Sequence, residues 1–77
     1  MFDKDEIKKA LIEAFPDSMI EVEGDDGVHF HATIVSSQFE GKTKIQQHQM
    51  VYRVLGSKVG NEIHALGLTT QIPGEKR

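Results

Sequence analysis

Residues 19–35 read MIEVEGDDGVHFHATIV, and this stretch decides the fold. Its two ends alternate between apolar and polar side chains, which is typical of half-buried strands. Between them lies Gly24-Asp25-Asp26-Gly27, a composition that favours a tight turn. The stretch therefore predicts a β-hairpin with strands over Met19–Glu23 and Val28–Val35.

Helical periodicity flanks the hairpin on both sides. From Asp3 to Phe15, apolar residues recur at helical spacing, and Pro16 ends the segment. After the hairpin, Ser36-Ser37 can cap one short helical turn, which Gly41 closes. A longer amphipathic helix follows, starting near Lys42 or capped by Thr43. Its expected buried stripe consists of Ile45, His48, Val51, Tyr52, Leu55 and Val59.

A third strand is predicted over Ile63–Thr70, which is rich in apolar and β-branched residues. The order helix, strand, strand, short helix, long helix, strand predicts an α+β domain. If the second and third strands are neighbours, the helical crossover between them makes them parallel, so the sheet is mixed. A three-stranded sheet needs helices packed on one face. We expect a single domain over residues 1–72, followed by a polar tail over residues 73–77.

Composition narrows the class of function. The 77 residues include twelve acidic and nine basic side chains and no cysteine. A chain without cysteine supplies no disulfide, no thiolate nucleophile and no all-thiolate metal site. The net charge of −3 argues mildly against a dedicated binder of the phosphate backbone. No constellation of catalytic residues and no phosphate-binding P-loop is present, so we expect a protein that is not an enzyme.

The sequence also bears on location. No apolar run is long enough to span a bilayer. The N-terminal residues are acidic and polar and do not resemble a secretory signal. We therefore expect a cytoplasmic protein with no membrane partner.

The predicted element order is that of a type II KH-like fold. A KH domain proper carries a Gly-x-x-Gly loop between its paired helices, which clamps the nucleic-acid backbone. Here that place reads Phe39-Glu40-Gly41-Lys42-Thr43-Lys44, which contains one glycine. The order predicts a KH-like fold without the KH clamp.

Three sequence blocks closely resemble the BolA family. They are VSSQFEGK over residues 35–42, HQMVY over residues 48–52 and IHAL over residues 63–66. The blocks occur in the family's order and at its spacing. With the first helix and the hairpin, the resemblance covers nearly the whole chain, and the chain is most similar to the small IbaG-type members.

The resemblance implies a partner and a metal centre. BolA-like proteins bind monothiol glutaredoxins, and the pair can share a [2Fe–2S] cluster. The glutaredoxin cysteine and glutathione supply thiolates, and the BolA-like chain supplies nitrogen ligands. The implied role is iron–sulfur cluster trafficking or iron-status signalling, with a monomeric apo chain and a heterodimeric complex. The lack of cysteine fits this role, because imidazole can ligate such a cluster beside thiolates.

His64, in the third block, matches the family's C-terminal ligand. Family members take the second ligand from the loop between the first two strands, but residues 24–27 contain neither His nor Cys. The nearest candidates are His29 and His31, which share one face of the predicted second strand. If that strand is parallel to the third, His29 approaches His64, and we prefer His29 because it is nearer the loop. His48 matches the family's helix motif and is expected to pack at the helix–sheet junction with a hydrogen-bond partner.

The alternative function is that of a KH-like nucleic-acid-binding transcriptional regulator, since some family members are described as regulators. This role needs a basic face near Lys42, Lys44 and Arg53 that contacts DNA or RNA. Gln47 and Gln49 flank His48 where the family often has arginines, which lowers the positive charge of the long helix.

Overall fold

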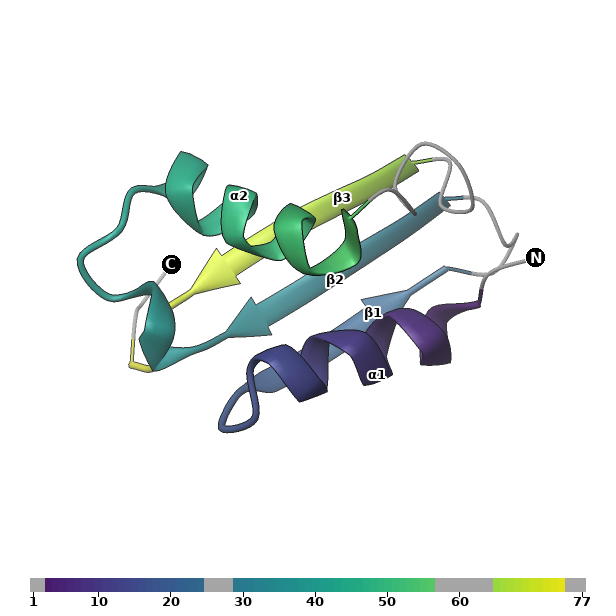
Figure 1. The fold of residues 1–77 in the computed structure, drawn as a ribbon, viewed down its shortest axis with the longest axis horizontal. Coiled ribbons are helices and arrows are strands. Elements are labelled where there is room, and N and C mark those ends of the chain that lie inside the picture. Colours follow the sequence, from purple (N-terminus) through teal and green to yellow (C-terminus); the bar gives the residue numbers. More distant parts are fainter. Residues whose placement is uncertain (1–2, 25–28, 57–64, 75–77) are drawn as a thin grey trace.

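The computed structural model describes residues 3–24, 29–56 and 65–74, and its elements follow the predicted order (Figure 1). Its elements are α1 (Lys4–Ala14), β1 (Met19–Glu23), β2 (His29–Val35), the short 3-10 helix η1 (Ser37–Phe39), α2 (Lys44–Leu55) and β3 (Ala65–Gln71). The strand order is β1-β2-β3, with β1 antiparallel and β3 parallel to β2. The predicted α+β fold with a three-stranded mixed sheet is therefore confirmed. The domain boundary at residue 72 stays a prediction.

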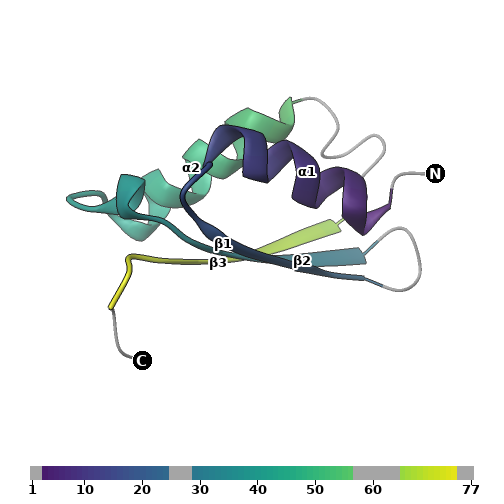
Figure 2. The same cartoon turned by 90° about the horizontal axis from the view of Figure 1, so that it is seen from below.

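Both long helices cover the same face of the sheet, as expected (Figure 2). The core lies between these two layers, and the side chains of Ile7, Leu11, Phe39 and Val51 are fully buried in it. Phe39 also packs its ring against Phe15, with 5.4 Å between the ring centroids. No described helix covers the other face of the sheet, where Met19, Glu21 and Glu23 of β1 and His29 and His31 of β2 are exposed.

Capping residues set the helix boundaries. The Asp3 carboxylate accepts the N–H of Glu6 at 3.0 Å, so α1 begins one residue after Asp3. Thr43 caps α2 and forms a capping box with Gln46. At the other end of α2, Gly56 has a φ of 61°, a conformation that favours glycine. α2 therefore ends at Leu55, and Val59 of the predicted stripe lies outside the described residues.

The buried face of α2 differs from the predicted stripe. Val51 and Leu55 are buried as expected, but the third buried residue is Gln47, and Ile45 is 71% exposed. Gln47, Val51 and Leu55 are spaced four residues apart and so share one side of the helix. Ile45 precedes Gln47 by two positions, which is about 200° of helical rotation, and it therefore faces solvent.

The buried Gln47 side chain joins α2 to β3 and to the loop before α2. Its amide nitrogen donates to the carbonyl oxygens of Lys42, at 2.9 Å, and Phe39, at 3.3 Å. Its amide oxygen accepts the Thr70 hydroxyl at 2.6 Å. Each polar atom of this buried amide is thus hydrogen-bonded, which removes most of the cost of its burial.

Candidate functional site

β2 and β3 begin at the same end of the sheet, since they are adjacent and parallel (Figure 1). The register pairs His29 with Ala65, the residue that follows His64 in the chain. His29 is exposed at the start of β2. The predicted ligand His64 and residues 25–28 lie outside the described residues.

His31, the alternative ligand, is held against β3. One of its ring nitrogens, Nε2, lies 2.8 Å from the Thr69 hydroxyl. Its ring also lies directly over Gly67, its register partner, where an added Cβ would be 2.7 Å from Nδ1. A cross-strand ring that covers a strand glycine compensates for the missing side chain. These contacts hold the His31 ring against β3.

The described residues do not form a complete metal site. Within residues 3–24, 29–56 and 65–74, no group of three His, Asp or Glu side chains could hold a metal ion. A cluster bound near His29 therefore needs ligands from residues outside these ranges or from a partner. Imidazole beside thiolate is a suitable donor set for a [2Fe–2S] centre.

The three basic residues considered for nucleic-acid binding lie in two separate parts of the structure. Lys42 and Lys44 lie close together at the start of α2 and line the same shallow cavity. The Lys44 ammonium donates to the Thr70 carbonyl oxygen, which ties it to β3. Arg53 follows Lys44 by nine positions, which corresponds to about 180° of helical rotation and about 13.5 Å along the axis. Arg53 therefore lies on the opposite side of α2 from Lys44.

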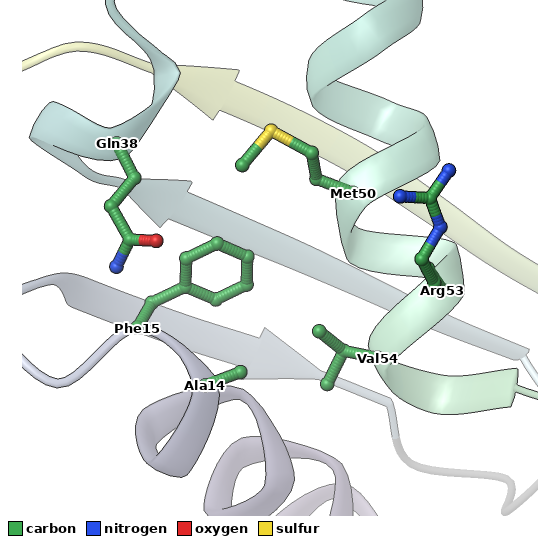
Figure 3. A pocket seen from close by; sticks show the side chains of 6 residues that line it. All are labelled: Ala14, Phe15, Gln38, Met50, Arg53 and Val54. Atoms are coloured by element: carbon green, nitrogen blue, oxygen red, sulfur yellow. The ribbon is translucent and has the colours of Figure 1, made fainter.

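Arg53 instead borders a hollow between α1 and α2, which Figure 3 shows. The hollow has a volume of about 290 Å³. Its lining is mostly apolar: Ala14, Phe15, Met50 and Val54, with Gln38 and Arg53 as the polar members. A polar-rimmed apolar hollow is not typical of a phosphate-binding surface, which relies on clustered cations.

His48 of α2 is half-buried and lies beside β3, as predicted for a residue at the helix–sheet junction. It borders a groove together with Lys44, Leu68, Thr69 and Thr70. Within the described residues, its expected hydrogen-bond partner is not seen.

None of the described helices is long and apolar enough to cross a membrane.

Sequence comparison finds relatives along nearly the whole chain. The family model described as BolA-like protein matches residues 6–75. Human BolA-like protein 1 is 30% identical over 80 residues, which cover 92% of this chain. The DNA-binding transcriptional regulator BolA of Haemophilus influenzae is 40% identical over 47 residues, which cover 61% of this chain. The chain spans 58% of the human protein's length and 46% of the Haemophilus protein's.

Solved structures share the fold. A BolA protein homologue from Coxiella burnetii has a TM-score of 0.81 and 38% identity, covering 95% of this chain and 94% of the homologue. The BolA domain of SufE1 from Arabidopsis thaliana has a TM-score of 0.83 and 28% identity, with the same two coverages. Element order, sheet topology and sequence thus agree, and the chain belongs to the BolA-like protein family.

Proposed function

We propose that this protein is a non-enzymatic partner of a monothiol glutaredoxin and that the two share a [2Fe–2S] cluster. His64 and His29 are the ligands from this chain, and the glutaredoxin cysteine and glutathione supply the thiolates. The role is iron–sulfur cluster trafficking or iron-status signalling. The BolA-like family supports this proposal, as does the occurrence of a BolA domain in SufE1 of Arabidopsis thaliana.

The observation that carries the proposal is the pairing of His29 with Ala65. Paired residues of neighbouring strands have Cα atoms about 5 Å apart. Ala65 directly follows the proposed ligand His64 in the sequence, and His64 itself lies outside the described residues. Both His29 and His31 are exposed on β2, and His29 lies in the register pair at the start of the two strands, two positions before His31.

The chemistry requires a complex. This chain has no cysteine, and two imidazoles alone are too few ligands for a [2Fe–2S] centre. The cluster-bound form therefore needs ligands from a second molecule, and we propose a heterodimer with the glutaredoxin and an apo monomer for the isolated chain. In the heterodimer, this chain's part is to hold two neutral imidazoles toward the iron that the partner's thiolates leave open.

The experiment is reconstitution of the full chain with a monothiol glutaredoxin, glutathione, iron and sulfide, followed by visible absorption and circular dichroism. We expect a heterodimer whose spectrum differs from that of the glutaredoxin homodimer. His64→Ala and His29→Ala should each remove the difference while the chain stays folded. His31→Ala and His48→Ala are the matched controls and should keep it. An unchanged heterodimer spectrum in His64→Ala would refute its role as a ligand.

A second candidate function is nucleic-acid binding, which the name of the Haemophilus relative favours. The residues for it are Lys42 and Lys44 at the start of α2, with Arg53 on the other side of that helix. Phosphate contacts by these residues would make binding weaken steeply as salt concentration rises. A titration of DNA and RNA oligonucleotides at several salt concentrations tests this, and salt-independent binding would exclude phosphate contacts. A cytoplasmic location remains a prediction.

A further inference from the structure

The free edge of β3 is the starting point. β3 is the last strand of the sheet, so one of its sides has no neighbouring strand among the described residues. The Gln71 carbonyl accepts the N–H of Ser36, which directly follows β2, so Gln71 turns toward β2. Alternate residues of a strand turn their N–H and C=O groups to opposite sides. The N–H and C=O groups of Leu66, Leu68 and Thr70 therefore point away from β2, toward the side of β3 without a described neighbouring strand.

Two side chains of α2 confirm this direction. The Tyr52 hydroxyl donates to the Leu66 carbonyl at 3.1 Å, and the Lys44 ammonium donates to the Thr70 carbonyl. Within the described residues, the N–H groups of Leu66 and Leu68 and the carbonyl of Leu68 have no partner. Both leucines are half-exposed. The edge thus offers more hydrogen-bond donors than acceptors and suits a ligand rich in acceptors.

Side chains of α2 lie beside this edge of β3. Ile45 and Tyr52 are seven residues apart and lie within about 20° of each other around the helix. Tyr52 is 39% exposed and Ile45 is 71% exposed, so this side of α2 presents apolar surface beside β3. Lys44 and His48, which are also on α2, border a groove together with Leu68 of β3. We call the β3 edge and this side of α2 the edge groove.

The charged side chains at the two edges of the sheet favour an acidic ligand beside β3. Among the described residues that border this groove, Lys44 is basic and none is acidic, although the whole chain has a net charge of −3. β3 has no charged residue. The other edge strand, β1, carries Glu21 and Glu23. An acidic strand is therefore repelled by one edge of the sheet and attracted to the other.

We propose that the edge groove binds an extended acidic segment of a partner protein, which adds to the sheet as a fourth strand beside β3. Backbone hydrogen bonds to Leu66 and Leu68 supply the pairing, and apolar side chains of the segment lie against Ile45 and Tyr52. A carboxylate of the segment takes the Lys44 ammonium. A nucleic acid has no peptide N–H groups with which to pair along the strand, and this difference makes the proposal testable by N-methylation.

The test is a titration of the ¹⁵N-labelled full chain with the acetylated peptide Val-Glu-Val-Glu-Val-Glu-Val-Glu. We expect chemical-shift changes and slowed amide exchange at Leu66 and Leu68. A peptide with Lys in place of Glu should bind at least tenfold more weakly. Two further peptides carry N-methyl groups on all Val or on all Glu residues. One of them should lose binding, because a strand pairs through alternate N–H groups only.

Variants locate the charge contact. Lys44→Glu should weaken peptide binding about tenfold, while Lys9→Glu, the same charge change on exposed α1, should leave it unchanged. The proposal is overturned if the acidic peptide shifts no β3 amide, or if both N-methylated peptides bind like the parent. It is also overturned if a single-stranded oligonucleotide binds more tightly with the same shifts. The titration contains no iron and no glutaredoxin, so its failure would not affect the cluster proposal.

Discussion

Replacing Gln47 by Met tests how much the buried amide contributes to stability. The substitution keeps the length and the helix propensity of the side chain but removes three hydrogen bonds, to Lys42, Phe39 and Thr70. At about 1 kcal/mol each, these bonds amount to about 3 kcal/mol. The Thr70 hydroxyl, in a residue only 2% exposed, then loses its acceptor, which offsets the gain from burying an apolar side chain.

This loss is large for a small domain. At roughly 0.05–0.15 kcal/mol per residue, a chain of this length has a free energy of unfolding of about 4–12 kcal/mol. A loss of about 3 kcal/mol corresponds to a fall in Tm of roughly 12–24 °C. Urea unfolding followed by far-ultraviolet circular dichroism measures the free energy directly.

The matched control is Gln49→Met, because Gln49 is exposed on the same helix and its substitution should change stability by less than about 0.5 kcal/mol. A double-mutant cycle with Thr70→Val isolates one of the contacts. The double variant should be about 1 kcal/mol more stable than the sum of the single effects predicts, since valine leaves no hydroxyl unpaired. A cost below about 1 kcal/mol for Gln47→Met would refute the reasoning.

Three further substitutions test the core, a helix cap and the open face of the sheet. Phe39→Ala removes a fully buried ring and should lower the free energy of unfolding by about 3–5 kcal/mol in urea unfolding; a loss below about 1.5 kcal/mol would contradict its place in the core. Thr43→Ala breaks the capping box with Gln46 and should cost about 1 kcal/mol by the same assay, whereas Thr43→Ser should keep most of the stability. Gly67→Ala places a methyl group against the His31 ring, so the ring must move away from Thr69. The ring proton signals of His31 should then shift by nuclear magnetic resonance, and unchanged signals would show that the ring does not lie over Gly67.

Local patterns predicted the elements well, because the physical causes are themselves local. Alternation of side chains marks β1, and proline after Phe15 ends α1. The caps at Asp3, Ser36 and Thr43 act within three residues of their own positions, so they can be recognised without any tertiary contact. The element order and the sequence blocks then sufficed to predict the family.

The candidate site was predicted in part. His29 stands at the start of β2, as expected, and the parallel pairing of β2 with β3 is confirmed. The role of His31 could not be assigned from the sequence, since its partners Gly67 and Thr69 are more than 30 positions away. A glycine inside a strand pattern was the one available signal of a close approach by another group. The proposed ligation by His29 and His64 stays a prediction.

Only the tertiary structure decided how α2 is rotated on the sheet. Periodicity predicted a buried Ile45 and left Gln47 out of the buried stripe, because it weighs each side chain by its hydrophobicity alone. Gln47 is buried because three groups from η1, the following loop and β3 converge on its amide. The same rotation carries Lys44 to the edge of β3 and Arg53 to the opposite side of the helix. Amino-acid sequence therefore determines where each element begins and ends, whereas contacts between distant segments determine which side chains each element buries.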